Sequence, residues 1–200
     1  MNDKWIIPNN EKVFLTSDTH FSHNKIIEFC KRPFSSVEEM DNTLINNWNK
    51  VVPKDGIVFH LGDFCFKGSQ RWKQLFEQLN GKIILIKGNH DERMQDSILN
   101  NFLHVTYQMR VQYKGKWIYL NHYPFACYSE TYRPDKTYQF HGHTHLNNRE
   151  NSGKDVEICK GLFKTQLDVG VDNNNFYPIT FDKALQQVEN QLLTNKFIWQ

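Results

Sequence analysis

The stretch KIILIKGNHD (residues 82–91) decides the fold, because an apolar run of strand length stops abruptly at polar residues. A short apolar run rich in isoleucine is typical of a buried β-strand. The residues before it favour a helix over Ser69–Leu79, closed by Asn80-Gly81. The apolar face of that helix would consist of Trp72, Leu75, Phe76 and Leu79. A helix that leads into a buried strand indicates an α/β fold.

The same alternation recurs along the chain. Further strands are predicted at VFLTSD (13–18), GIVFHLGD (56–63), TYQFHGHTH (137–145), TQLDVGVD (165–172) and YPITF (177–181), with a hairpin at 110–124 that turns at Lys114-Gly115. Further helices are predicted over Asn24–Lys31, from Ser35-Ser36 through Trp48, and over 181–193. The polar segment 147–160 is predicted to be a surface loop. We therefore expect a single α/β domain over residues 1–200 with more than one sheet.

Composition narrows the class of protein. The chain has 200 residues, 39% of them hydrophobic, and a net charge of +2, so it can build a core and shows no electrostatic preference for nucleic acid or a membrane. Cysteines 30, 65, 127 and 159 form no CxxC pair and are expected to be reduced thiols. The first twelve residues lack a signal-peptide core, and no apolar run approaches the ~20 residues of a membrane span. We expect a cytoplasmic location.

Five predicted strands end in residues whose side chains are of the types that bind metal ions in proteins. They are Asp18-Thr19-His20, Gly62-Asp63, Gly88-Asn89-His90-Asp91, Asn121-His122 and Gly142-His143-Thr144-His145. Ligands of α/β sheets bind beyond the carboxyl ends of the strands, where side chains from several strands converge. Glycine before Asp63, Asn89 and His143 lets the backbone turn sharply or approach an ion closely. Each motif alone is common, but the five together predict one polar site.

The order DxH, GD, GNHD, H and GHxH resembles the calcineurin-like metallophosphoesterases, and in particular their small bacterial or phage-type members. The resemblance spans residues 18–145 with every motif present. It implies a four-layer α/β/β/α sandwich, with two mixed sheets face to face and helices outside. It also implies a phosphoester hydrolase with two divalent metal ions. Imidazole and oxygen donors without thiolate suit manganese, iron (Fe²⁺ or Fe³⁺), zinc or nickel.

By the same resemblance, Asp63 bridges the two metals. The first metal would also take Asp18, His20 and His145, and the second Asn89, His122 and His143. A hydroxide activated between the metals would attack phosphorus. His90 adjoins a ligand without being one in the family, so it is the candidate general acid, and Asp91 would orient it or raise its pKa. Asp91 could instead only cap a helix over Glu92–Leu99.

Other polar residues have weaker assignments. His23 is expected to face the site and touch the substrate phosphate, or else to begin a helix. Arg32 is a candidate for a basic side chain that contacts the substrate phosphate, and the other candidates are Lys67, Arg133 and Lys136. His60 and His141 are expected to be buried structural histidines, and His104 to lie outside the chemistry. The aromatic residues Tyr123, Phe125, Tyr128, Tyr132 and Tyr138 would pack as a loop or stack a nucleobase, with packing the preferred interpretation.

Departures from the protein-phosphatase branch bear on the substrate. Phe66 and Lys67 stand where that branch has a second acid and an arginine, and lysine lacks the bidentate fork of arginine. We therefore expect a phosphodiesterase for small or nucleotide-like phosphoesters. A phosphomonoesterase, a metal-dependent nuclease and a non-catalytic metal-binding module remain alternatives. A nuclease would need a basic groove, for which a net charge of +2 gives no support. The sequence does not determine the oligomeric state.

Overall fold

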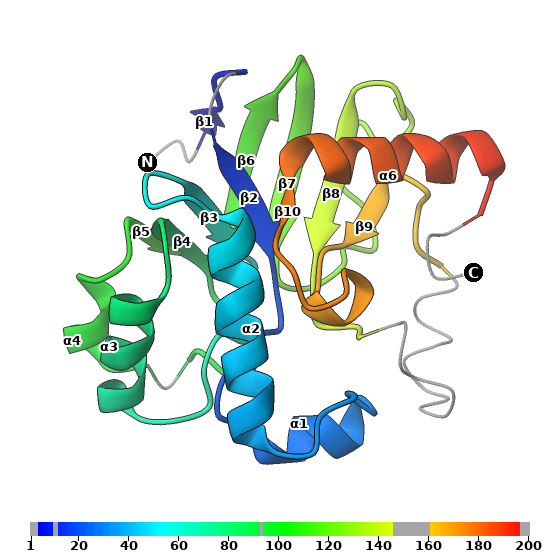
Figure 1. Ribbon diagram of the computed structural model, residues 1–200. Helices are drawn as coiled ribbons and strands as arrows, with labels where there is room; N and C mark the ends of the chain where they lie inside the picture. The colour runs from blue at the N-terminus through cyan, green and yellow to red at the C-terminus, as the bar shows by residue number, and fades with distance from the viewer. Residues whose placement is uncertain (1–3, 10–11, 93, 146–160, 197–200) are drawn as a thin grey trace.

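Two five-stranded sheets form the centre of the protein in the computed structural model, which describes residues 4–9, 12–92, 94–145 and 161–196 (Figure 1). The first sheet contains, in spatial order, β10 (Ile179–Thr180), β2 (Val13–Thr16), β3 (Ile57–His60), β4 (Lys82–Ile86) and β5 (His104–Thr106). The second contains β1 (Lys4–Ile6), β6 (Gln108–Tyr113), β7 (Lys116–Asn121), β8 (Thr137–His141) and β9 (Gln166–Asp168). Both sheets are mixed. Strand β10 is antiparallel to β2 and strand β6 is antiparallel to β7, whereas all the other neighbouring strands are parallel.

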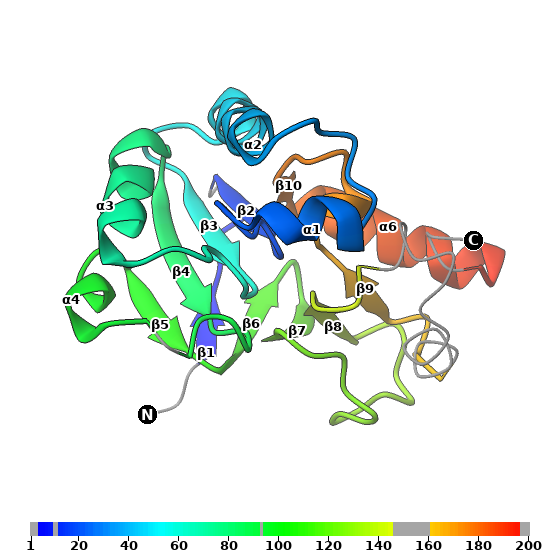
Figure 2. The ribbon, with the colours of Figure 1, turned by 90° about the horizontal axis from the view of Figure 1, so that it is seen from below.

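The helices are distributed unevenly around the sheets. They are α1 (Asn24–Phe29), α2 (Val37–Val51), α3 (Ser69–Gln78), α4 (Asp96–Leu99) and α6 (Phe181–Thr194), with a short 3₁₀ turn at Val171–Asn173. Helices α2, α3 and α4 lie along the outer face of the first sheet (Figures 1 and 2). Helix α6 packs against β2, β9 and β10 and closes one side of the space between the sheets.

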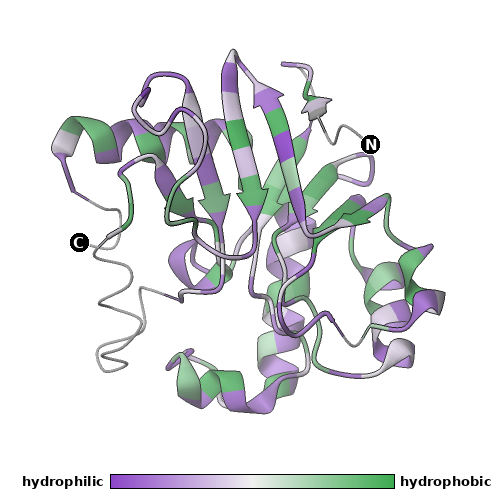
Figure 3. Cartoon of the chain, turned by 180° about the vertical axis from the view of Figure 1, so that it is seen from behind, coloured by the Kyte–Doolittle hydropathy of each residue, from purple (hydrophilic) through white to green (hydrophobic). Residues whose placement is uncertain are grey.

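The main apolar core lies between the two sheets. Leu15 and Phe59 from the first sheet meet Leu120 and Phe140 from the second, and Phe181 of α6 joins them. In β6 every second residue is buried, and the strands seen from behind alternate hydrophobic and hydrophilic residues (Figure 3). The predicted α/β sandwich of two mixed sheets with helices is thereby confirmed.

Local signals in the sequence account for several boundaries. The hydroxyl of Ser36 accepts the backbone N–H of Glu39 at the start of α2, and the Glu39 carboxylate accepts the N–H of Ser35 in return. Lys114 and Gly115 both have positive φ, as the tight turn of a β-hairpin requires. The predicted α2 and hairpin are confirmed.

The structure adds two strands to those predicted and gives several of the predicted elements shorter bounds. Strands β1 and β5 are additional, and each is a three-residue edge strand without an alternating pattern. Strand β8 ends at His141, so His143 and His145 lie beyond the strand, as the glycine before His143 predicts. The strand predicted over 165–172 ends at Asp168, and the helix expected over 92–99 begins only at Asp96. The predicted loop at 147–160 lies outside the described residues. No helix in the described part of the chain has both the length and the apolarity to cross a membrane.

Candidate dinuclear metal site

The loops after five strands converge at one end of the two sheets (Figure 2). Backbone hydrogen bonds join them: the N–H of Asp18 donates to the carbonyl of Gly62 at 3.0 Å, and that of His20 to the carbonyl of Asp63 at 2.9 Å. On the second sheet, the N–H of Gly142 donates to the carbonyl of His122 at 3.0 Å. The two sheets thus present their polar strand ends to the same space.

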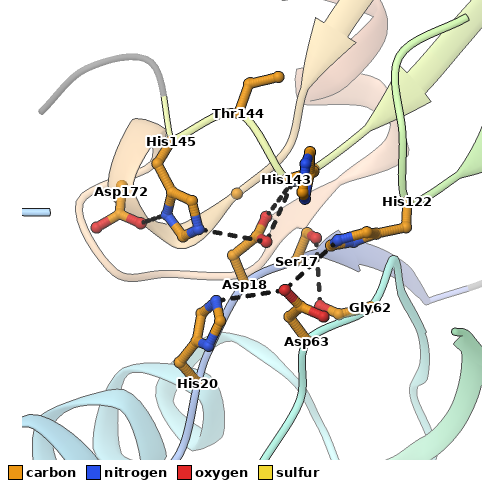
Figure 4. Close-up of polar contacts among 12 residues, drawn as sticks. Ser17, Asp18, His20, Gly62, Asp63, His122, His143, Thr144, His145 and Asp172 are labelled. Carbon is orange, nitrogen blue, oxygen red and sulfur yellow. Dashed lines mark hydrogen bonds and ion pairs between the residues drawn. The ribbon is translucent and has the colours of Figure 1, made fainter. Parts of the chain in front are cut away.

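Two groups of side chains meet there (Figure 4). The ligand atoms of Asp18, His20 and His145 all lie within 4.8 Å of one another, and so do those of Asp63, His122 and His143. Asp63 lies between the groups, with Oδ2 3.5 Å from Nε2 of both His20 and His122. Oδ1 of Asn89 is 3.1 Å from Nε2 of His122. All seven predicted ligand residues are therefore brought together.

The spacing of these atoms fits divalent ions. Nε2 of His20 is buried without a hydrogen-bond partner in the described structure and lies 3.5 Å from the Asp63 carboxylate. That separation exceeds a normal N–H···O distance. Two atoms bound about 2.1 Å from one tetrahedral ion lie about 3.4 Å apart. A buried ring nitrogen without a hydrogen-bond partner, at this distance from a carboxylate oxygen, has the spacing expected of two ligands that share one metal ion.

Partners behind the histidines fix which ring nitrogen faces the site. Nδ1 of His122 donates to the carbonyl oxygen of Leu61 at 2.7 Å, which leaves Nε2 toward Asp63. Nδ1 of His145 donates to Oδ2 of Asp172 at 2.7 Å, which leaves Nε2 3.6 Å from Oδ1 of Asp18. Hydrogen bonds of this kind orient metal-binding imidazoles and set their tautomer. The two rings are thus held ready for coordination through Nε2.

Arg32 supports the site from behind. Its guanidinium forms a bidentate ion pair with Asp172, at 2.8 and 2.9 Å, and donates to the backbone carbonyls of Asp18 and Thr19. The Arg32 side chain is fully buried. This placement does not match the predicted substrate contact, because every charge-bearing nitrogen faces the protein. Arg32 instead anchors the DTH loop to Asp172.

Asp91 also has a role other than those predicted. Its buried carboxylate accepts three backbone N–H bonds, from Asp63 at 2.7 Å, Gly88 at 2.9 Å and Phe64 at 3.0 Å. Burial raises its pKa to about 6, partly offset by these hydrogen bonds. The carboxylate neither contacts the His90 ring among the described contacts nor caps a helix, since Gln95 occupies the cap of α4. Asp91 ties the GD loop to the GNHD loop and so places Asp63.

His90 and His23 line a pocket of about 620 Å³ beside the two groups. The His90 side chain is 38% exposed, and its Nε2 lies 4.0 Å from Oδ2 of Asp63. Nδ1 of His23 lies 3.3 Å from Nδ1 of His20. Burial lowers the pKa of His23 to about 4, and the neighbouring His90 and Arg32 act in the same direction. Both histidines therefore face the space where a substrate would bind.

The remaining histidines are placed as the sequence indicated. Nε2 of His60 lies 3.0 Å from the hydroxyl of Thr19, at the centre of the DTH motif, and burial lowers the pKa of His60 to about 3. His141 is buried, with Nδ1 2.9 Å from the carbonyl of Gly142. His104 is exposed on β5. None of these three belongs to a candidate metal-binding group among the described residues.

The backbone of the site is strained. Five of the seven predicted ligands have positive φ, between 45° and 69°: Asp18, His20, Asp63, His143 and His145. Such conformations cost about 1–3 kcal/mol each and cluster at functional sites. Glycine is required where the loops touch, because a Cβ on Gly88 would lie 2.3 Å from Oδ1 of Asp63. The fold therefore holds these side chains in positions that local preferences alone would not give.

Three residues of the site escaped the sequence analysis. They are Asp172, Asp168 and Ser17. Asp172 forms a hydrogen bond with His145 and an ion pair with Arg32. Asp168 accepts a hydrogen bond from the hydroxyl of Thr144, and the hydroxyl of Ser17 donates one to the carbonyl oxygen of Leu61. The available signal was the stretch TQLDVGVD (165–172), where acids follow an apolar run as Asp18 and Asp63 do.

Fold and site together define an α/β sandwich protein with a candidate dinuclear metal centre at its strand ends. The family model described as calcineurin-like phosphoesterase matches residues 11–181. The chain belongs to this family of phosphoester hydrolases.

Individual relatives agree with this membership. The chain is 34% identical over 180 residues to the uncharacterized protein MJ1445 of Methanocaldococcus jannaschii, covering 89% of this chain and 92% of that protein. It is 27% identical over 186 residues to the Gene 66 protein of Mycobacterium phage L5, covering 80% and 86%. The crystal structure of the Aquifex aeolicus protein of unknown function AQ665 has a TM-score of 0.66 and 24% identity, covering 88% of this chain and 99% of that one. The last comparison supports the fold alone.

Proposed function

We propose that this chain is a dinuclear-metal-dependent phosphodiesterase for small or nucleotide-like substrates. We prefer a diester to a monoester as the substrate because no arginine is found among the described residues that line the pocket. A dianionic monoester is well matched by the bidentate fork of arginine. Arg32 has its fork turned toward Asp172, so the pocket offers only point charges to the phosphate. A diester carries a single negative charge on its phosphate and therefore needs less positive charge around it.

The proposed ligands form two sets that share Asp63. One set is Asp18, His20 and His145, and the other is Asn89, His122 and His143. Manganese, iron, zinc or nickel suits such mixed nitrogen and oxygen donors. Two bound divalent ions would supply a hydroxide nucleophile near neutral pH and neutralise charge on the phosphate oxygens.

His90 is the proposed proton donor to the leaving oxygen. Its backbone N–H donates to Oδ1 of Asp63 at 2.9 Å, which fixes the residue beside the proposed bridging carboxylate. Its ring is exposed to the pocket, with Nε2 4.0 Å from Oδ2 of Asp63. A leaving alkoxide on that side of the phosphate would take its proton from the His90 ring. Asp91 contributes by holding the loop and not by touching the ring.

A substrate panel tests the proposal. Metal-free protein supplemented with manganese is assayed on bis-p-nitrophenyl phosphate, p-nitrophenyl phosphate, cyclic nucleotides, dinucleotides and single-stranded DNA. We expect the highest kcat/KM for small diesters and loss of activity with a chelator. Faster turnover of monoesters would replace the diesterase by a monoesterase, and a preference for DNA with steep salt dependence would indicate a nuclease.

Variants separate the proposed roles. Asp63→Asn or His143→Ala should remove metal and activity together. His90→Ala should keep its metal and lose kcat, most severely for poor leaving groups, because these depend on protonation. His104→Ala is the matched control, since it removes an exposed histidine from β5. Equal losses for good and poor leaving groups in His90→Ala would contradict the acid role.

A further inference from the structure

One wall of the pocket beside the candidate metal site consists of residues that are not proposed metal ligands. Its inner side consists of proposed metal ligands and His90. Its outer side comes from α1 and from the segment that follows β3, and it includes Phe29 and Phe66. The Phe29 side chain is 65% exposed and that of Phe66 is 48% exposed. Two large apolar side chains are therefore open to solvent in the pocket that holds the reactive groups.

Phe66 is held in a defined orientation next to His90. Its ring stacks on the imidazole of His23, with centroids 3.8 Å apart and planes 8° apart. It also meets the ring of His90 edge to face, with centroids 5.1 Å apart and planes at 62°. An aromatic ring fixed on one side and open on the other is a pre-organised surface for a second flat ring. The side chain proposed to protonate the leaving group thus adjoins an exposed aromatic surface.

The charges around this wall favour an anion. Lys25 and Lys67 line the same pocket and are exposed, and neither has an ion-pair partner among the described residues. Asp63 is the single carboxylate among the described lining residues, and it belongs to the proposed metal site. A pocket with unpaired lysines at its rim attracts anionic substrates. The charge around this pocket therefore favours ligands that carry phosphate.

We propose that Phe66 and Phe29 form the subsite for a flat aromatic group on the leaving side of the substrate, namely the base of a nucleoside leaving group. The inference rests on the proposed phosphodiesterase function and adds the chemical class of the leaving alcohol. The leaving oxygen takes a proton from His90, so the group attached to it lies on the His90 side of the phosphate, over Phe66. Water adds to phosphorus, the P–O bond to the nucleoside breaks, and the nucleoside departs as an alcohol.

Two substrates that share a retained nucleotide isolate this subsite. Both are esters of adenosine 5′-phosphate: one with the 3′ oxygen of a second adenosine, the other with methanol. Cleavage of the ester bond to the second adenosine or to methanol releases 5′-AMP from either substrate, so one assay of 5′-AMP serves both. Cleavage of the other P–O bond would give adenosine 3′-phosphate or methyl phosphate and is measured separately. The kcat/KM of each is measured for the manganese-loaded wild type, for Phe66→Leu and Phe29→Leu, and for Tyr107→Leu as the control. Tyr107 is an aromatic residue that is 61% exposed and does not line this pocket.

We expect the kcat/KM of the wild type to be at least about tenfold higher for the nucleoside leaving group. Stacking of one base on an aromatic side chain contributes about a factor of ten or more to binding, whichever base it is. Phe66→Leu should reduce this preference severalfold or more, Phe29→Leu should reduce it less, and Tyr107→Leu should leave it unchanged. Equal losses on both esters in Phe66→Leu, with metal content retained, would overturn the subsite while leaving the diesterase intact. Hydrolysis of monoesters but neither diester would overturn the proposed function and the subsite together.

Discussion

Nδ1 of His145 lies 2.7 Å from Oδ2 of Asp172, and the same carboxylate forms a bidentate ion pair with the buried guanidinium of Arg32. The hydrogen bond turns Nε2 of His145 toward Asp18, and the ion pair fixes the carboxylate that makes it. Loss of such a carboxylate typically lowers metal affinity 10–100-fold. We expect Asp172→Asn to weaken metal binding about 10–100-fold, as measured by titration of the metal-free protein.

Asp182→Asn is the control for Asp172→Asn. Asp182 is an exposed carboxylate that pairs with Lys114 at the far end of β6. Its replacement should leave metal affinity unchanged. Wild-type affinity in Asp172→Asn would mean that Asp172 stabilises the fold without orienting His145.

Asp91→Asn tests the backbone role of that carboxylate. The asparagine amide would present N–H donors where the backbone N–H groups of Asp63, Gly88 and Phe64 need acceptors. Leaving buried donors unpaired costs about 1–3 kcal/mol. We expect the free energy of unfolding to fall by about that amount and metal content to fall with it, because Asp63 loses its support. Denaturant unfolding and metal analysis measure both effects.

The alternative for Asp91 makes a different prediction. If Asp91 acted only by tuning His90, the variant would keep its stability and its metal and lose kcat. That combination would contradict the positioning role derived from the three backbone hydrogen bonds.

Gly142→Ala tests the close approach of the two sheets at the site. A Cβ on Gly142 would lie 1.9 Å from Oγ of Ser17 and 2.4 Å from Oδ2 of Asp18. Because Asp18 also accepts the N–H of His143, we expect the variant to displace both and to lose metal. Gly68→Ala is the matched control, since nothing lies within 4 Å of its added Cβ. Normal metal content in Gly142→Ala would show that the loops can separate without loss of the site.

The sequence predicted the convergence of the site because parallel neighbouring strands end at the same edge. Strands β2, β3 and β4 are adjacent and parallel, so acids and amides placed after each of them must meet. The motifs therefore predicted one polar site, and the resemblance to the family named the seven residues that the structure brings together. The alternation of apolar runs and helices predicted an α/β domain with more than one sheet, and the resemblance to the calcineurin-like metallophosphoesterases implied that the sheets form a sandwich.

Long-range partnerships were not visible in the sequence. Arg32 and Asp172 are 140 residues apart, and no local pattern shows that a buried ion pair joins them. The direction of the Asp91 side chain depends on the loop after β3, which lies against it only in the folded chain. The edge strands β1 and β5 are formed by pairing with a neighbour and not by their own pattern. Such features arise from packing, which residue periodicity does not encode.

Metal affinity should rise with pH, because the metal-free site binds protons that an ion must displace. Burial alone would lower the pKa of His122, but its hydrogen bond to Asp63 and the charges of Asp18 and Asp63 raise it to about 9. A raised pKa means that His122 carries its proton throughout the range below 9, so the proton on Nε2 must leave before coordination. Exchange of one proton for the metal makes the affinity rise about tenfold per pH unit. His145, whose pKa the Asp18 and Asp172 carboxylates raise against the effect of burial, adds to that slope. Titration between pH 6 and 8, in paired buffers of different ionisation enthalpy, measures both the slope and the released protons. An affinity independent of pH in this range would show that His122 and His145 are already neutral before the metal binds.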